Sequence, residues 1–125
     1  MERNQLAATI RLVQANLTWK PGSAEQHVKQ RIRRGHLPPT ATLMEYEDII
    51  RTVISNDNAQ VYIFWYNATP YISIIDVVNG NHWLVMFALN GVLESAYIVE
   101  RPERYLNKSE FEYVGLLSKV ASHDD

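Results

Sequence analysis

The chain has 125 residues, no cysteine and a formal net charge of −2 at pH 7. A chain of this length can bury an ordinary hydrophobic core, and the lack of cysteine excludes disulfides and thiolate chemistry. The N-terminus has no apolar run with a small-residue cleavage pattern, and no stretch is long enough to span a membrane. We therefore expect no signal peptide, no membrane partner and a cytoplasmic location.

The charge is unevenly distributed. Residues 1–40 carry seven cationic side chains against two carboxylates, a net +5, whereas residues 41–125 carry five against twelve, a net −7. A local excess of cations favours phosphate binding. The alternative is that such a split arises by chance in a small protein.

We predict a single α+β domain over residues 1–125, in which N-terminal helices are followed by a four-stranded antiparallel meander sheet and a C-terminal helical segment. The three parts cover residues 1–57, 58–100 and 101–125. Helical spacing of apolar residues in the first part predicts an amphipathic helix from Arg3 to Leu17 and a second helix from Ser23 to Gly35. A third helix is predicted from Thr42 to near Asn56.

The ends of these helices carry capping signals. Ser23 can cap the second helix, with Gln26 reaching back to it, and Gly35 can close that helix in a left-handed conformation. Thr42 and Glu45 form a capping box for the third helix.

The hydrophobic pattern then changes to the period of two that is typical of strands. We predict four strands, separated by turns at 68–70, 79–81 and 90–91, from Gln60 to Asn67, Tyr71 to Val78, His82 to Leu89 and Val92 to Glu100. Asn-Gly is a strong hairpin signal, and such short turns make neighbouring strands antiparallel. Alternation places Trp83, Val85 and Phe87 on the face that packs against the helices. Residues 105–120 are predicted to form a loop and a last helix.

The second helix carries the residues with the most reactive chemistry. At about 100° per residue, His27, Arg31 and Arg34 lie within an arc of roughly 60°, beside the apolar stripe formed by Val28 and Ile32. We expect the three polar side chains at the rim of the packed face. A cation and an imidazole one turn apart can reach the same phosphate.

These elements resemble the small ribonuclease domains grouped around barnase, EndoU, the tRNA-cleaving colicins and the RelE-type toxins, in particular their phage and polymorphic-toxin branches. The resemblance covers residues 23–100. It rests on the order of helices and meander, and on His27-x-x-x-Arg31-x-x-x-Gly35-His36, Thr42 to Ile50, Trp83 to Met86 and Asn90 to Tyr97. Those toxins often read Thr-Ala-Tyr or Thr-Ala-Phe where this chain has Ser95-Ala96-Tyr97.

The resemblance implies a metal-independent endoribonuclease, or a domesticated relative, without a cofactor. It would cleave RNA by attack of the ribose 2′-hydroxyl on the adjacent phosphate. His27 would transfer protons, Arg31 would stabilise the phosphorane, and Ser95 would orient the phosphate. Substrate binding would involve Lys20, Arg34, His36 and Tyr97. The partners would be RNA and a cognate inhibitor protein.

Several of these residues also have a purely structural interpretation. His27 can be a half-buried histidine bonded to a carbonyl, and Arg31 can form a surface ion pair with Glu25 or Glu45. Tyr97 can lie on a sheet face covered by another element. Glu94 alternates to the face opposite Ser95, so we do not assign it as a general base. No residues have convincing metal-ligand spacing.

Two other functions remain open at this point. One is a catalytically inactive module that binds protein or RNA with the same fold. The other is a small-molecule sensor with a pocket between helix and sheet.

Overall fold

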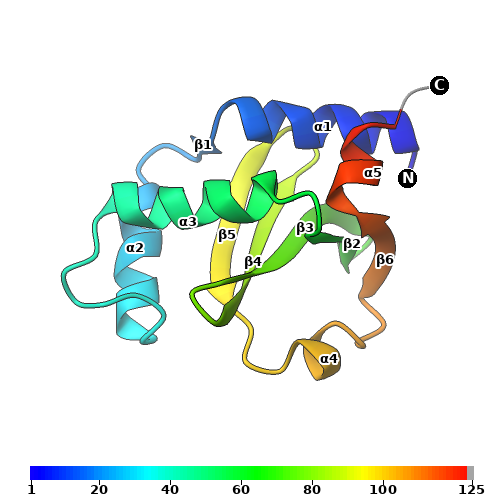
Figure 1. Ribbon diagram of the computed structural model, residues 1–125. Coiled ribbons are helices and arrows are strands. Elements are labelled where there is room, and N and C mark those ends of the chain that lie inside the picture. The colour runs from blue at the N-terminus through cyan, green and yellow to red at the C-terminus, as the bar shows by residue number, and fades with distance from the viewer. Residues whose placement is uncertain (124–125) are drawn as a thin grey trace.

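The computed structural model describes residues 1–123 as an α+β fold built on one mixed, six-stranded sheet (Figure 1). The strands are ordered β1-β5-β4-β3-β2-β6. The elements, in chain order, are α1 (Arg3–Ala15), β1 (Thr18–Trp19), α2 (Ala24–Arg33), α3 (Leu43–Ser55), β2 (Gln60–Tyr66), β3 (Thr69–Val78), β4 (Asn81–Ala88), β5 (Val92–Ile98), α4 (Pro102–Tyr105), β6 (Phe111–Leu116) and α5 (Leu117–Ala121).

The four predicted strands form the centre of the sheet as an antiparallel meander, β2 to β5, and this prediction is confirmed. The turn between β3 and β4 has positive φ at both Asn79 and Gly80, as a two-residue hairpin requires. The turn between β2 and β3 was predicted one residue too late. It is formed by Asn67 and Ala68, both at positive φ, and Pro70 belongs to β3, near the start of which a proline is tolerated.

Two outer strands were not predicted. The short β1 pairs in parallel with β5, and β6 pairs antiparallel with β2. The prediction of a C-terminal loop and helix was therefore wrong for residues 111–116. The spacing of Phe111, Val114 and Leu117 suits a helix. Without β6, however, one edge of β2 would have unpaired backbone groups, and pairing with this edge makes residues 111–116 a strand.

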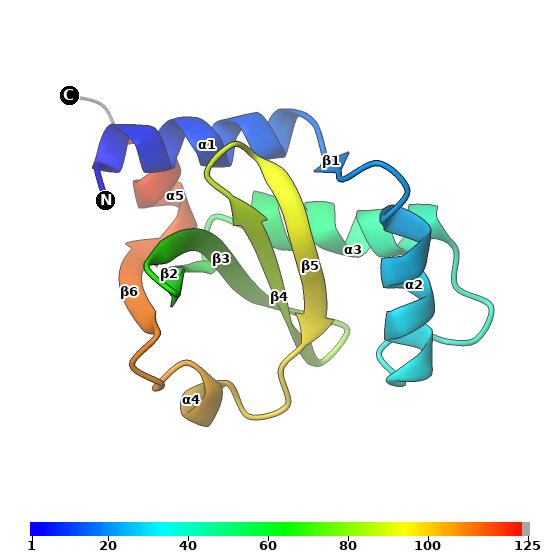
Figure 2. The same cartoon turned by 180° about the vertical axis from the view of Figure 1, so that it is seen from behind.

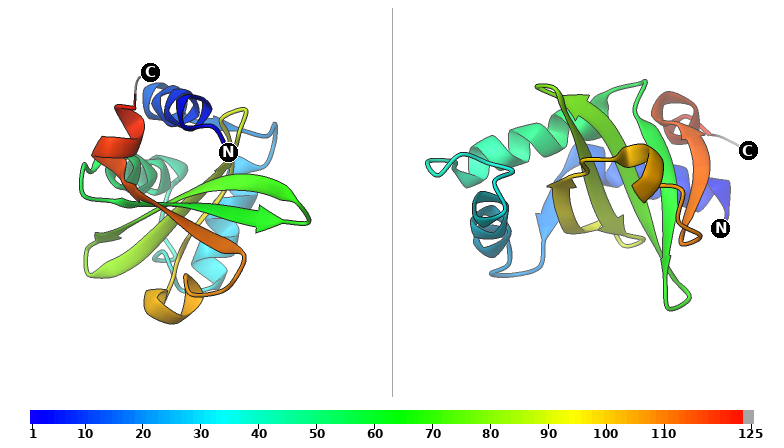
Figure 3. Two further views of the ribbon diagram at one scale, coloured as in Figure 1. Left: turned by 90° about the vertical axis from the view of Figure 1, so that its right-hand side faces the viewer. Right: turned by 90° about the horizontal axis from the view of Figure 1, so that it is seen from below.

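The larger hydrophobic core lies between the sheet and the helices on one of its faces. Figure 3 shows α1, α3 and α5 on this side of the sheet and α4 on the other. Trp83, Val85 and Phe87 are buried in this core, as predicted, together with Ile10 of α1 and Ile50 of α3. The capping box of Thr42 and Glu45 at the start of α3 is also present.

The opposite face of the sheet carries a second, smaller hydrophobic cluster. Its buried members are Ile75, Leu84, Val99 and Phe111, and Tyr105 of α4 packs against it. The main helices do not cover this face (Figure 3). Tyr62 and Tyr97 pack at the margin of the cluster, so tyrosines line this face.

Candidate functional site

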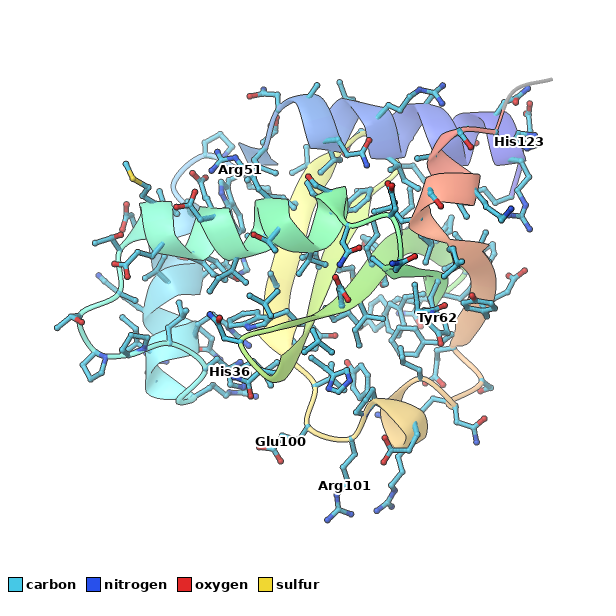
Figure 4. The ribbon with its side chains drawn as sticks, in the orientation of Figure 1. His36, Arg51, Tyr62, Glu100, Arg101 and His123 are labelled. Carbon is cyan, nitrogen blue, oxygen red and sulfur yellow. The ribbon has the colours of Figure 1, made fainter. Side chains whose placement is uncertain are left out.

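A pocket of about 860 Å³ lies where β5 ends, between α2 and α4. Figure 2 shows these two helices on either side of the end of β5. The pocket is lined by Arg31, Arg34, His36, Ser95, Tyr97, Ile98, Val99, Glu100, Arg101, Arg104, Tyr105 and Lys108. Cationic side chains outnumber the single carboxylate, Glu100. In Figure 4, His36, Glu100 and Arg101 all lie at this end of the molecule.

The end of α2 brings His36 against Arg31. Gly35 has a φ of +77°, its N–H donates to the Ile32 carbonyl, and the N–H of His36 donates to the Arg31 carbonyl at 2.8 Å. This is the Schellman arrangement of a helix C-terminus, in which the residue after the glycine turns back over the last turn of the helix. The Nη1 atom of Arg31 and the Nδ1 atom of His36 are consequently 3.1 Å apart.

The start of α2 differs from the prediction. Ser23 has a helical conformation and its side chain makes no capping bond; its hydroxyl donates instead to the Lys20 carbonyl. The turn over residues 20–23 places Ser23 in the helical region before α2 begins, so the extended cap geometry that Gln26 was expected to complete does not form.

Arg31 is buried without a counter-ion. It is 7% exposed, and its Nε–H has no hydrogen-bond partner within residues 1–123. The ion pairs within residues 1–123 are Lys20–Glu94, Arg51–Glu47 and Arg51–Asp48. The alternative of a surface ion pair between Arg31 and Glu25 or Glu45 is therefore wrong. Burial lowers the pKa of Arg31. The charge is therefore held in an unfavourable environment.

The prediction that Arg31 lies at the rim of the helix was wrong. In α2 the buried residues are Val28 and Arg31, whereas Ile32 is only half-buried. The guanidinium lies over the ring of Tyr97, with Cζ 5.7 Å from the ring centroid. A guanidinium can stack on an aromatic ring, which allows a face of α2 that includes a cation to pack on the sheet.

His36 acts as a hydrogen-bond acceptor. Its Nδ1 accepts from the backbone N–H of Ile98 at 3.2 Å and faces the guanidinium of Arg31. A nitrogen that accepts cannot carry a proton, so the neutral ring is protonated on Nε2. Burial and the charges of Arg31 and Arg34 lower the pKa of His36, and Glu100 opposes this effect.

This arrangement predicts that acid destabilises the protein. Because the folded-state pKa of His36 lies below its ordinary value of 6.5, the unfolded chain binds more protons as the pH falls through and below 6.5. The free energy of unfolding should therefore decrease from about pH 7.5 to about pH 5.5, as measured by urea denaturation.

The variant His36→Asn tests the contribution of His36. Its amide oxygen can accept from the Ile98 N–H but does not titrate, so the decrease in the free energy of unfolding should be smaller. The pKa of His27 is lowered in the same direction, so part of the decrease should remain. A variant with the wild-type slope would contradict this role of His36.

β5 contributes the polar groups on the floor of the pocket. Ser95 and Tyr97 both line it, as their alternation along the strand predicts. The two hydroxyls of Tyr97 and Tyr105 are 2.6 Å apart, and burial raises the pKa of Tyr97, so its phenol stays protonated. Tyr97 is half-buried, so the expected covering of this face is partial and comes from Tyr105.

β5 has a bulge at Glu94, which interrupts the regular alternation of side chains between the two faces of the sheet. Met86 pairs with Ser95 and Phe87 with Leu93, so Glu94 is the extra residue. Its carboxylate forms an ion pair with Lys20 at 3.4 Å. Bulges often occur next to functional sites, where they redirect a side chain. Here the result is that Glu94 and Lys20 neutralise one another outside the lining of the pocket.

His27 is likewise not among the lining residues. Its ring lies against Trp19 with centroids 5.1 Å apart. Burial lowers the pKa of His27, and the positive charge of Arg31 adds to this, while Glu94 raises it. The structure thus brings Arg31, Arg34, His36, Ser95 and Tyr97 together in one pocket and leaves His27 and Lys20 beside it.

Three cations of the pocket were missed by sequence reasoning. Arg101, Arg104 and Lys108 belong to the α4 segment, in the half of the chain with a net negative charge. The sequence does contain a signal for this basic cluster, because Pro102 can start a short helix and Arg101 and Arg104 lie at its first turn. The cluster was overlooked because residues 41–125 as a whole have a net negative charge.

Within residues 1–123 there is no group of three or more His, Asp or Glu side chains placed to hold a metal ion. No helix in the same range is long and apolar enough to cross a membrane. None of the family models, curated proteins or solved structures compared with the chain matches it.

Proposed function

We propose that the protein binds RNA by holding its phosphates in the pocket around Arg31. The observation that carries this proposal is the buried guanidinium of Arg31, which has an unpartnered Nε–H and no counter-ion among residues 1–123. A buried charge is costly unless it is paired, and a bound anion supplies the missing partner. The planar fork of arginine suits phosphate oxygens especially well.

The surrounding charges favour a ligand with more than one anionic group. Arg34, Arg101, Arg104 and Lys108 line the same pocket and form no ion pair with any residue in the range 1–123. Each is placed to neutralise a further phosphate along a polynucleotide. The hydroxyls of Ser95 and Tyr97 add neutral donors to the phosphate oxygens.

Binding should be sensitive to salt. Contact with three or four phosphates of a single strand gives a slope of about −2 to −3 in a plot of log affinity against log salt concentration. The measurement is fluorescence anisotropy of a labelled single-stranded oligoribonucleotide. Substituting both Arg31 and Arg34 with alanine should remove most of the affinity and flatten the slope.

The matched control is the double variant Lys29→Ala/Arg33→Ala. It removes the same charge from the same helix, but neither residue lines the pocket. This control should bind RNA nearly as the wild type does. Equal losses in the two double variants would indicate a general charge effect and would refute a specific site. Absence of binding at low salt would refute the proposal as a whole.

A second candidate function is cleavage of the bound RNA. The observation in its favour is that burial, together with the guanidinium charge of the nearby Arg31, lowers the pKa of His27, which favours the neutral imidazole. His36 does not serve as the base, because its Nδ1 already accepts a hydrogen bond and its Nε2 carries the proton. A neutral imidazole can take the proton of the 2′-hydroxyl as that oxygen attacks the phosphorus. The bond to the 5′-oxygen then breaks, that oxygen receives a proton, and a 2′,3′-cyclic phosphate remains. Arg31 would stabilise the phosphorane and Ser95 would orient it.

Cleavage is tested with purified protein, total tRNA and short oligoribonucleotides in the presence of a chelator, scored for cyclic-phosphate ends. Arg31→Ala and His27→Ala should each abolish cleavage, whereas His36→Asn, which keeps an acceptor for the Ile98 N–H, should retain most of it. Full activity in His27→Ala would refute proton transfer by this residue. RNA that binds but is never cleaved would identify the protein as a binding module.

A further inference from the structure

A continuous row of aromatic side chains extends from the pocket across the sheet face that the main helices leave uncovered. The ring centroids of Tyr97 and Tyr105 are 6.1 Å apart, and those of Tyr105 and Phe111 are 5.3 Å apart. The next distance along the row, from Phe111 to Tyr62, is 6.2 Å. Tyr62 lies 5.1 Å from Tyr113. We call this row, together with Phe64 and Tyr66, the aromatic face.

Strand pairing explains how the row forms. Tyr62, Phe64 and Tyr66 alternate along β2 and so point to one side of the sheet. On β6, Phe111 and Tyr113 stand in register with Phe64 and Tyr62. The sheet therefore places aromatic rings from two strands on one surface, and Tyr105 of α4 connects them to the pocket. Figure 4 shows Tyr62 on this side of the fold, near β6.

The aromatic face has two ends that are open to solvent, because Phe111 contacts both Phe64, next to Tyr66, and Tyr62, next to Tyr113. Tyr66 is 59% exposed and Tyr113 is 53% exposed. Two large rings exposed on neighbouring strands add little to the stability of the fold, because most of their surface stays in water. Rings that are rigidly mounted and exposed are the usual platforms on which unpaired bases stack.

A hollow of about 320 Å³ lies beside this row, on the side of α4 away from the Arg31 pocket. It is lined by Tyr62, Pro102, Glu103, Leu106 and Asn107. An aromatic wall with an amide and a carboxylate at its edge offers one stacking surface and hydrogen-bonding groups for the edge of a base. α4 thus has basic residues facing the pocket on one side and this hollow on the other.

We propose that the aromatic face is a base-stacking track for single-stranded RNA, whose phosphates enter the Arg31 pocket. The inference rests on the proposed function, because the cations of the pocket are what favour a nucleic acid as the occupant of the adjoining aromatic surface. It deepens that function by defining the substrate class. Unpaired bases are required, and the rings on which they can stack are the exposed Tyr66 and Tyr113 and the half-buried Tyr62, because Phe111 in the middle of the row is buried. A duplex, whose bases are already stacked, does not fit this role.

The test compares two ligands that share a backbone. One is an oligouridylate of about eight nucleotides, and the other is an abasic oligomer with the same number of phosphates. The variant Tyr66→Ala/Tyr113→Ala should bind the oligouridylate roughly 5- to 150-fold more weakly than the wild type, the range expected for loss of one stacked base. It should bind the abasic oligomer as the wild type does.

Two controls separate stacking from other effects. Tyr66→Phe/Tyr113→Phe keeps both rings and should retain wild-type affinity for the oligouridylate. Met44→Ala removes a side chain that is 71% exposed on α3, away from the aromatic face, and should change nothing. Because Tyr66 and Tyr113 are exposed, the alanine variants should fold normally, which circular dichroism checks.

The outcomes distinguish this inference from the proposed function. If the wild type binds the abasic oligomer and the oligouridylate equally well, or if the tyrosine variants bind normally while Arg31→Ala does not, the stacking track is refuted and the phosphate pocket stands. If the wild type binds neither oligomer, the proposed function fails and this inference fails with it. A duplex bound more tightly than the single strand would also overturn the track.

Discussion

Replacing Arg31 with methionine is expected to weaken RNA binding strongly while leaving the protein as stable as the wild type or more stable. Arg31 is 7% exposed and has no counter-ion in the described part of the chain, so its burial costs free energy in the absence of a ligand. Replacing buried charges with apolar side chains of similar volume is often neutral or stabilising, by up to about 4 kcal/mol. His36 keeps its acceptor bond from Ile98 in the variant.

The loss of RNA affinity should be about 30-fold or more, the usual cost of removing one partner of a buried charge pair. Urea denaturation measures the stability and fluorescence anisotropy measures the affinity. The control Arg33→Met, on the same helix but outside the pocket, should leave both nearly unchanged. A strongly destabilised Arg31→Met variant would show that Arg31 has a structural role, and would remove the main argument for an anion site.

Truncating Phe87 to alanine is expected to lower the free energy of unfolding by about 3–5 kcal/mol. Phe87 is fully buried between the sheet and the helices, so the variant loses the transfer free energy of the ring and leaves a cavity. Urea denaturation at neutral pH measures this loss. The control Met44→Ala, at an exposed site, should change stability by no more than about 0.5 kcal/mol. A loss below about 1 kcal/mol at Phe87 would mean that the packing face of β4 is assigned wrongly.

Local signals account for most of what the sequence predicts correctly. The Thr42–Glu45 capping box forms, and the Asn79-Gly80 hairpin joins β3 and β4. These features depend on residues close together in the chain, and so they can be read without the tertiary fold. The burial of Phe87 follows in the same way, from alternation within a single strand.

The missed strands depend on contacts between distant segments. β6 forms because β2 offers a free edge, and β1 forms because the chain passes β5 on its way to α2. Neither pairing leaves a strong local pattern: β1 spans Thr18–Trp19 alone, and the spacing of Phe111 and Val114 also suits a helix. Tertiary pairing decides such segments.

In the candidate site, too, local patterns were predicted correctly and features that depend on tertiary packing were not. Alternation placed Ser95 and Tyr97 on one face, and both line the pocket. The depth of Arg31 was not predictable from the helix pattern, because an arginine beside an apolar stripe is normally solvated. The pairing of His36 with Arg31 was available in principle, since Gly35 predicts a Schellman end that brings those two positions together.

The proposed RNA binding requires that a phosphate of the RNA occupies the pocket at Arg31. The most direct measurement is the side-chain Nε–H signal of Arg31 in a ¹H–¹⁵N spectrum, assigned by comparison with Arg31→Met, during titration with the oligouridylate. We predict that this signal shifts progressively and saturates at the same RNA concentration as the anisotropy change, because the unpartnered Nε–H gains a phosphate acceptor. An Arg31 signal that does not move while RNA binds would place the RNA elsewhere and contradict the account.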